Sequence, residues 1–241
     1  MKFRLDKLVL ETGKFSSRTR AIESIENGGI KVDGEFILKP GKKIDEKSKI
    51  EIVLGESKWV SRGAHKLLHA LDYWEINVSN KKAIDIGAST GGFTQVLLEK
   101  NINKVYCIDV GHGQLKDQIK KDTRVINHEK THVKKLSQLK IANDISLIVI
   151  DVSFISLKKV IPFIKHIKKS EVVFLIKPQF EVGPENINKH GIVKDESLYE
   201  KVIMEIKHLI INNNYTWEGV IESPIKGTNG NKEFLAYAKN Q

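Results

Sequence analysis

The stretch that decides the fold is Asp85-Ile86-Gly87-Ala88-Ser89-Thr90-Gly91-Gly92-Phe93, at the junction between strand-like residues 83–86 and helix-like residues 93–99. Glycines at such a junction let backbone amides approach a ligand at the N-terminus of the helix. The spacing Gly-x-x-x-Gly-Gly differs from the Gly-x-Gly-x-x-Gly of dinucleotide-binding turns, and the Gly-Lys-Ser/Thr of a nucleotide P-loop is missing. The stretch therefore predicts a strand, a ligand-binding turn and a helix.

Strand-like and helix-like segments alternate from this stretch to the end of the chain. The expected strands are 83–86, 105–108, 124–126, 145–150, 172–176, 215–221 and 233–238. The expected helices are 93–99, 113–121, 156–168 and 197–212. Such alternation is typical of a parallel sheet with helices on both faces. We therefore expect an α/β fold: a doubly wound, mostly parallel, seven-stranded Rossmann-like sheet.

The first fifty residues have a different pattern. Residues 3–27 predict two short amphipathic helices, the second with an N-cap at Ser16-Ser17 and a stop at Gly28-Gly29. The turn Asp33-Gly34 between apolar segments predicts a hairpin, and residues 49–53 alternate as a strand does. We expect a small α+β domain at 1–56, a linker at 57–60 and the α/β domain at 61–241.

Composition narrows the class of protein. The 241 residues are 40% hydrophobic and 29% charged, as in ordinary globular proteins, and the single Cys107 fits a reducing cytosol. No signal peptide and no apolar run near the ~18 residues of a membrane span is evident. A cytoplasmic protein with no membrane partner is expected. The net charge of +10 suggests a polyanionic partner, but the excess is spread over both domains.

Two charged residues directly follow buried strands. Asp151 ends the apolar run 147–150, and Lys177 ends the run 172–176. The carboxyl ends of parallel strands share one rim, where ligands bind, so these two side chains should lie side by side. Lys66 lies in the segment 61–67 ahead of the first strand of the sheet, and Glu233 opens the last strand.

A Lys66-Asp151-Lys177-Glu233 set on such a sheet resembles the catalytic tetrad of FtsJ-type RNA ribose 2′-O-methyltransferases. By that resemblance Lys177 activates the ribose hydroxyl, Asp151 positions Lys177, and the other two orient the ribose. A ribose hydroxyl is a poor nucleophile, and a lysine among carboxylates can be partly neutral or can stabilise the developing alkoxide. For any one of the four alone, a structural ion pair is the alternative.

The glycine turn, together with an acid after the second strand, resembles S-adenosylmethionine methyltransferases. The resemblance implies that Asp85 lies near the methionine end of the cofactor and that Asp109 holds the ribose. The alternative is a purely structural turn. The full set of cofactor residues that it implies is Asp85, Gly87, Ala88, Ser89, Gly91, Gly92, Phe93, Asp109, Val110 and Glu129.

The N-terminal pattern resembles the alpha-L RNA-binding motif of a small-subunit ribosomal protein and many pseudouridine synthases. The residues that would contact RNA by this resemblance are Arg4, Ser17, Arg18, Arg20, Lys31 and Arg62. For each of them individually, a solvated surface position is the alternative.

The motifs together resemble the TlyA family over nearly the whole chain. They are residues 59–67, 85–93, 110–115, 151–157, 177–181 and 223–227. The family methylates cytidine 2′-hydroxyls of ribosomal RNA, and the chain looks like the shorter form that acts on the large subunit. The implied partner is ribosomal RNA or a ribosomal subunit, bound by a monomer or weak dimer. The alternatives are an RNA-binding protein with a vestigial cofactor pocket, or a membrane-active haemolysin, as the family was formerly labelled.

One motif resembles the signature of a zinc site. His128-Glu129-Lys130-Thr131-His132 matches the His-Glu-x-x-His zinc signature, which requires both histidines on one helical face. Here it follows a predicted strand, and Thr131 and Val133 disfavour a helix. We therefore expect no metal site.

Overall fold

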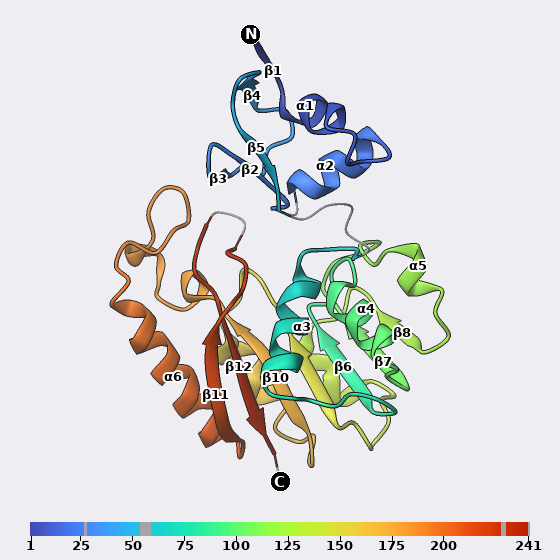
Figure 1. Cartoon of the computed structure of the whole chain (residues 1–241). Helices are drawn as coiled ribbons and strands as arrows, with labels where there is room; N and C mark the ends of the chain where they lie inside the picture. The colour runs from blue at the N-terminus through green and yellow to red at the C-terminus, as the bar shows by residue number, and fades with distance from the viewer. Residues whose placement is uncertain (27, 54–58, 228–229, 241) are drawn as a thin grey trace. The chain divides into compact units, whose positions relative to one another are not determined.

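The computed structural model describes residues 1–26, 28–53, 59–227 and 230–240 (Figure 1). The chain forms two compact units, Met1–Arg62 and Gly63–Gln241, called here the N-terminal and C-terminal units. Residues 57 and 58 of the predicted linker lie outside the described residues.

The N-terminal unit packs two helices against short strands. The helices are α1 (Leu5–Glu11) and α2 (Arg18–Glu26), and the strands are β1 (Lys2–Arg4), β2 (Ile30–Val32), β3 (Glu35–Phe36), β4 (Lys43–Asp45) and β5 (Ile50–Ile52). Strand β2 lies between β3 and β5, and β1 pairs with β4. The predicted hairpin is confirmed, because Asp33 and Gly34 have φ values of 51° and 85°, which a type I′ turn requires. The β1–β4 pair was not predicted, since three-residue strands are too short to show alternation.

The predicted helix N-cap is also confirmed. The Ser17 hydroxyl accepts a hydrogen bond from the Arg20 amide at 3.3 Å, one turn into α2. The apolar faces of both helices meet the small sheet around Leu5, Val9, Ile25 and Ile30, which are fully buried. This unit therefore has a core of its own.

The C-terminal unit is built on the predicted seven-stranded sheet. Its strands are β6 (Lys82–Ile86), β7 (Lys104–Ile108), β8 (Val125–His128), β9 (Leu147–Ile150), β10 (Glu171–Ile176), β11 (Thr216–Glu222) and β12 (Phe234–Lys239). The order is β11-β12-β10-β9-β6-β7-β8. Strands β6 to β10 pair in parallel, and β12 runs antiparallel between β10 and β11. The chain crosses from β8 to β9 over the sheet, so the order reverses beside β6, where such sheets bind ligands.

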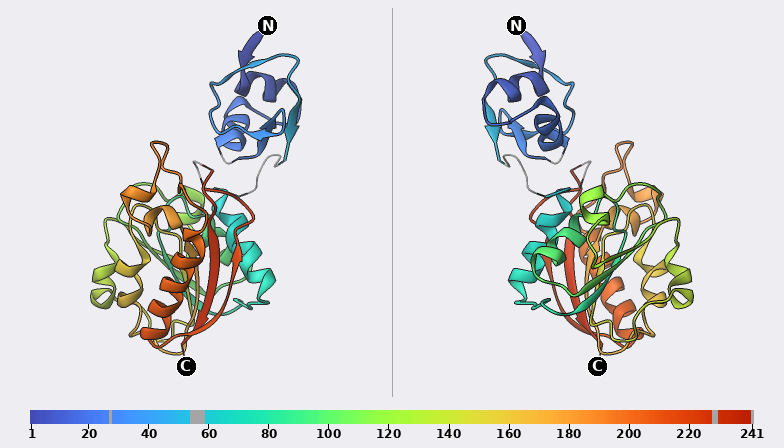
Figure 2. Two further views of the ribbon diagram at one scale, coloured as in Figure 1. Left: turned by 90° about the vertical axis from the view of Figure 1, so that its left-hand side faces the viewer. Right: turned by 90° about the vertical axis from the view of Figure 1, so that its right-hand side faces the viewer.

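Helical elements cover both faces of this sheet (Figure 2). One face carries α3 (Gly63–Tyr73) and α4 (Gly92–Glu99). The other carries α6 (Leu198–Asn212) and three 3₁₀ helices, η1 (Val133–Gln138), η2 (Leu157–Lys159) and η3 (Ile161–Phe163), whose apolar residues join one buried cluster with the strands. The expected fold class is confirmed.

Two predicted helices are wrong in extent. The helix expected at 156–168 is replaced by η2 and η3, because Pro162 lacks an amide hydrogen and its ring disfavours a continuous helix. The helix expected at 113–121 shrinks to α5 (Asp117–Lys120). Gly113, with a φ of 65°, belongs to the preceding loop instead.

Candidate active site

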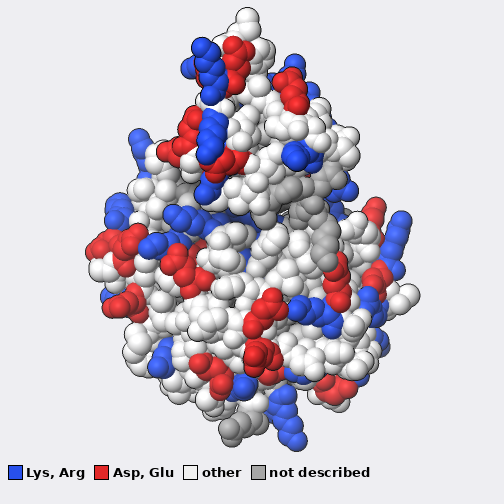
Figure 3. All heavy atoms as spheres, viewed as in Figure 1, with Lys and Arg blue, Asp and Glu red and all other residues white. Residues whose placement is uncertain are grey.

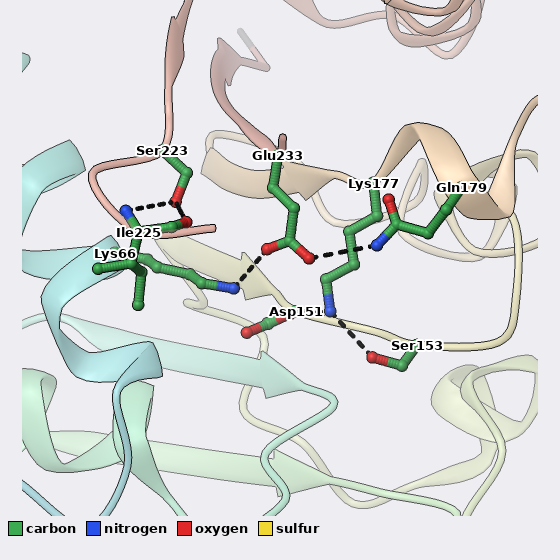
Figure 4. Close-up of polar contacts among 8 residues, drawn as sticks. All are labelled: Lys66, Asp151, Ser153, Lys177, Gln179, Ser223, Ile225 and Glu233. Carbon is green, nitrogen blue, oxygen red and sulfur yellow. Dashed lines mark hydrogen bonds and ion pairs between the residues drawn. The ribbon is translucent and has the colours of Figure 1, made fainter. Parts of the chain in front are cut away.

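The rim at the carboxyl ends of β9 and β10 brings Asp151 and Lys177 together. Phe174 of β10 pairs with Ile150 of β9, so the two strands end at the same edge of the sheet. The Lys177 ammonium lies 2.6 Å from Asp151 Oδ1 and donates a hydrogen bond to the Ser153 hydroxyl at 2.9 Å. The predicted neighbourhood of these two residues is therefore present (Figure 4).

A second lysine–carboxylate pair lies beside the first. Lys66 projects from α3 and places its Nζ 2.5 Å from Oε2 of Glu233, which immediately precedes β12. Gln179 Nε2 donates to the other oxygen of Glu233 at 3.3 Å. Figure 4 shows the four charged side chains pointing toward one another. The structure thus brings together four residues that span 167 positions of sequence.

These charges are held largely out of water. Lys66, Lys177 and Glu233 are only 5%, 8% and 3% exposed. Burial of a charge is costly unless a counter-charge and hydrogen bonds compensate it, so removal of one partner leaves the other with a large penalty. A site with paired but preorganised charges can stabilise a charge that develops in a reaction.

A tight loop holds Glu233 in place. A Cβ at Gly227 would lie 2.5 Å from Glu233 Oε1, so the close approach requires glycine. The buried Asn231 side chain donates to the Gly191 carbonyl at 2.8 Å and accepts from the Val193 amide at 3.2 Å. These contacts tie the Glu233 segment to the loop after β10. The sequence analysis singled out neither contact, because each joins residues far apart in the chain.

A hollow of about 390 Å³ opens beside the Lys177–Asp151 pair, over the carboxyl ends of β6, β7 and β9. Four predicted cofactor residues line it: Gly87, Ser89, Asp109 and Val110. Its other lining residues include Gln114, Thr131, His132, Val133 and Ile155, none of which is in the set of cofactor residues predicted from the sequence. Residues 131–133 follow β8 closely, so the strand-end rule could have indicated them.

The glycine turn shapes one wall of the hollow. Gly87 has a φ of 86°, and a Cβ there would overlap the carbonyl oxygen of Asp151. Asp109 accepts hydrogen bonds from the Ser89 amide at 2.8 Å and from the Gly111 amide at 2.7 Å. One carboxylate therefore fixes both loops that border the hollow.

Asp85 lies under this turn and is fully buried. Its Oδ2 accepts a hydrogen bond from the Thr94 hydroxyl at 2.6 Å, whereas its Oδ1 has no hydrogen-bond partner within the described part of the chain. Burial raises the pKa of Asp85 to about 7, and the Thr94 hydrogen bond opposes this shift. An unsatisfied buried carboxyl is costly to the fold, as functional sites often are.

The other predicted cofactor residues surround the hollow without lining it. Ala88, Gly92 and Phe93 are buried, and Gly91 forms the N-cap of α4 with a φ of 96°. Glu129 contacts the side chains of Asn127 and His112. The Asn127 hydrogen bond, with help from the Gly113 amide, lowers the pKa of Glu129 to about 2.

An exposed aromatic side chain stands at the edge of the site. Phe154 is 92% exposed and adopts a φ of 61°, an unusual conformation for a bulky residue. Its ring centroid lies 5.2 Å from that of Phe180, which follows the Lys177 strand end. The sequence placed Phe154 in a motif, but only the structure shows its exposure.

In the N-terminal unit, Asp6 binds two of the arginines that are predicted to contact RNA. Arg4 and Arg18 both donate to Asp6, with closest distances of 2.9 and 2.8 Å, while the Asp6 side chain is fully buried. The Arg4 hydrogen bonds, aided by Arg18, outweigh burial and lower the pKa of Asp6 to about 2. Asp6 therefore holds two half-exposed guanidinium groups next to each other.

The remaining residues that are predicted to contact RNA make separate contacts of their own. Arg20 pairs with Glu23 at 3.2 Å on the surface of α2, and the Lys31 ammonium lies 4.7 Å from the Phe36 ring centroid. Ser17 acts as the helix cap described above, and Arg62 is partly buried at the end of this unit.

The zinc-like motif is not helical. His128 ends β8, Lys130 has a φ of 52°, and His132 is the N-cap of η1. The two histidines therefore do not share a helical face, as the sequence analysis predicted.

Comparison with known proteins agrees with this arrangement. Residues 59–240 match the family described as FtsJ-like methyltransferase, and residues 3–50 match the S4 domain. The chain is 36% identical to the 16S/23S rRNA (cytidine-2′-O)-methyltransferase TlyA of Mycobacterium tuberculosis, with 99% of this chain and 90% of the relative covered.

Two further relatives extend the comparison. The 23S rRNA (cytidine-2′-O)-methyltransferase TlyA of Campylobacter jejuni is 34% identical over 92% of this chain and 93% of its own. A solved structure from Streptococcus thermophilus, named as a hemolysin, is 36% identical, covers 100% of this chain and 89% of its own, and superposes with a TM-score of 0.76.

The close approach at Gly87 predicts a sharp effect of one methyl group. Gly87→Ala should weaken S-adenosylmethionine binding by about 5- to 150-fold, since overpacking by a methyl costs about 1–3 kcal/mol. Gly34→Ala is the matched control, because Gly34 has nearly the same φ, 85°, but no atom within 4 Å of the added Cβ. Calorimetric titration of both folded variants measures the effect. Equal affinities would show that the turn does not border the cofactor.

The raised pKa of Asp85 predicts that its removal stabilises the C-terminal unit but weakens cofactor binding. Its carboxyl stays protonated in the folded protein up to pH ~7, but ionises near pH 4 when unfolded, so stability falls as pH rises from about 4 to 7. Asp85→Asn should therefore stabilise the C-terminal unit at pH 8, by on the order of 2–4 kcal/mol, and much less at pH 4.5. It should also weaken cofactor binding.

Urea unfolding followed by the fluorescence of Trp74 and Trp217, both in the C-terminal unit, measures this difference. Asp72→Asn is the control, since Asp72 is exposed and pairs with Lys100 at 2.9 Å. An Asp85→Asn protein that is less stable than the wild type at pH 8 would contradict the prediction.

Proposed function

The chain belongs to the TlyA family of FtsJ-like methyltransferases with an N-terminal S4 domain, and we propose that it methylates a cytidine ribose 2′-hydroxyl in ribosomal RNA. The cofactor is S-adenosylmethionine, as in the family. The large-subunit RNA is the substrate that we expect, and the protein would act in the cytoplasm as a monomer or weak dimer.

The observation that carries this proposal is the buried set Lys66, Asp151, Lys177 and Glu233 beside the hollow. Methylation of a base amine or a base carbon needs catalytic groups other than these lysines and carboxylates. The one cysteine, Cys107, is fully buried within β7, and burial raises the pKa of its thiol, so a thiolate nucleophile is disfavoured. Two lysine–carboxylate pairs on a dry rim instead suit the removal of a hydroxyl proton.

The residues of the hollow fit the expected cofactor. The turn at Gly87 has no side chain, so a bound molecule can approach its backbone closely. Asp109 lies where an acid can hold ribose hydroxyls. The unsatisfied Asp85 Oδ1 lies under the same turn, where a cationic methionine end would favour the ionised form of this carboxyl. When bound, the cofactor supplies an electrophilic methyl group. Asp151 lines the hollow and pairs with Lys177, so the hydroxyl and the methyl group would meet there.

Lys177 is the residue that we assign to the ribose hydroxyl. Its Nζ lies at the junction of the hollow and the tetrad, and Asp151 and Ser153 fix its position. In the proposed reaction Lys177 acts as the neutral amine, after it has released a proton to solvent. It takes the hydroxyl proton as the oxygen attacks, and Asp151 stabilises the ammonium that forms. Lys66 and Glu233, held together and by Gln179, orient the ribose.

The exposed Phe154 supports a nucleic acid as the substrate. An aromatic face that is open to solvent beside a catalytic lysine can stack on an unpaired base, which contributes about 1–3 kcal/mol. The Phe180 ring lies against one side of the Phe154 ring. The S4 domain would supply phosphate contacts through the guanidinium groups that Asp6 organises.

The haemolysin label has less support. Of the described residues, no helix is long and apolar enough to cross a membrane. The charged groups at the carboxyl rim instead support methyl transfer as the function.

Methyl transfer to ribosomal RNA tests the function directly. Ribosomal subunits from a strain that lacks this gene are incubated with the protein and tritiated S-adenosylmethionine, and the modified nucleotide is mapped. We expect label on one or a few cytidines as 2′-O-methylcytidine. Label on a base, or none in RNA, would refute the proposed function.

Lys177 gives the sharpest test of mechanism. Lys177→Ala should bind cofactor and RNA, yet lose single-turnover rate by the ~10² to 10⁴ typical of a general base. Lys177→Arg should fail as well, because an arginine cannot accept the proton. Lys81→Ala is the control, since Lys81 pairs with Glu171 at the opposite edge of the sheet. A near-normal rate in Lys177→Ala would exclude it from the chemistry.

A further inference from the structure

The positive charge of the chain is concentrated in one segment of the C-terminal unit. Residues 130–170 contain nine lysines but only two acids, Asp144 and Asp151, which gives +7 of the formal +10. The lysines are Lys130, Lys134, Lys135, Lys140, Lys158, Lys159, Lys165, Lys168 and Lys169. Between Asp151 and Glu171 there is no acidic residue at all.

The fold places most of these lysines on one surface. In η1, Val133 and Leu136 join the buried cluster, while Lys134 and Lys135 are exposed. In the next segment Leu157, Ile161 and Ile164 face the same cluster, and the lysines between and after them face solvent. The layer that covers this face of the sheet is therefore apolar inside and cationic outside. We call the exposed residues Lys134, Lys135, Lys140, Lys159, Lys165, Lys168 and Lys169 the lysine surface.

Carboxylates do not neutralise this surface. Within the described residues, none of its seven lysines forms an ion pair, whereas the neighbouring Lys158 pairs with Glu205 at 2.7 Å. Some lysines elsewhere in the unit are paired: Lys82 with Asp144, Lys100 with Asp72 and Lys239 with Glu218. The face of the C-terminal unit drawn in Figure 3 accordingly shows both signs interspersed. This surface differs from the rest of the unit in its lack of nearby acids, since residues 152–170 contain none.

The lysine surface borders a hollow of about 730 Å³ at the amino ends of β9 and β10. His166, Lys168 and Lys169 line one side of it, and Ser137, Asn143 and Ser146 add polar groups. The tetrad lies at the other ends of the same strands. Lys177 lies seven positions after Ser170, which corresponds to about 23 Å along a strand. Lys168 and Lys169, which precede Ser170, are therefore remote from the ribose that reacts.

We infer that the lysine surface binds the phosphate backbone of the substrate RNA at nucleotides remote from the target, as a second anchoring site besides the S4 domain. The inference rests on the proposed function for the identity of the RNA. Nucleic-acid interfaces are rich in positive charge, whereas lysine is depleted in protein–protein interfaces. Unpaired ammonium groups on one surface complement a chain of phosphates, and each contact releases counterions.

A pair of charge-neutralising substitutions tests the inference. Lys165→Gln/Lys168→Gln removes two charges of the surface and leaves Lys169, whose φ of 54° makes it sensitive to change. Lys100→Gln/Lys239→Gln is the matched control, because it removes the same net charge from lysines that already have carboxylate partners. Both variants keep every residue of the tetrad, of the cofactor hollow and of the S4 domain.

Binding to ribosomal subunits from a strain lacking this gene is measured at several salt concentrations, alongside cofactor affinity, melting temperature and single-turnover methylation at saturating subunits. We expect Lys165→Gln/Lys168→Gln to bind less tightly, with the slope of log affinity against log salt reduced by about 1.4 to 1.8. Its saturated rate, cofactor affinity and melting temperature should match the wild type. The control should keep the wild-type slope within error.

The outcomes separate this inference from the proposed function. If the wild type methylates and binds the subunits but Lys165→Gln/Lys168→Gln has the same slope and affinity, the lysine surface does not bind RNA. An equal loss in the control would show a general charge effect and would also overturn the inference. If the wild type neither binds nor methylates ribosomal RNA, the proposed function itself fails.

Discussion

The structure depends on keeping two lysines and two carboxylates together at a rim that is largely closed to water. Each of these charges would be costly alone, so the surrounding chain must bring its partner within ion-pair distance. Lys66 comes from a helix before the sheet, Asp151 and Lys177 from adjacent parallel strands, and Glu233 from the entry to the antiparallel strand. Parallel pairing of β9 with β10 and insertion of β12 beside β10 are therefore requirements of the site as well as of the fold.

Close backbone approaches make this arrangement possible. Gly87 lets the first turn touch the end of β9, and Gly227 lets its loop touch the Glu233 carboxylate. A Cβ at Gly87 would overlap the carbonyl oxygen of Asp151, and a Cβ at Gly227 would crowd the Glu233 carboxylate. Asp85 lowers the stability of the fold, because its carboxyl is buried under the turn with one unsatisfied oxygen. Sites that bind charged ligands often retain such strain at the expense of stability.

Most of the fold could be predicted from the sequence, because strand and helix patterns in the C-terminal unit are long and regular. The failures have local causes. Pro162 divides the segment after β9 into 3₁₀ turns, and the three-residue strands β1 and β4 are too short for their periodicity to be read. Of the predicted cofactor residues, the ones that line the hollow are Gly87, Ser89, Asp109 and Val110, while the buried glycines and Phe93 support the turn.

The sequence by itself determined the class of sheet, the ligand-binding turn and the four charged residues, because each belongs to a local pattern or directly follows a strand. Only the tertiary structure decided that Lys66 pairs with Glu233, that Ser153 and Gln179 complete the set, and that Asp6 joins Arg4 to Arg18. It also decided that lysines from two segments form one unpaired surface, although their charge seemed evenly spread along the chain. Pairing and exposure depend on distances between residues far apart in sequence, and no local pattern encodes those distances.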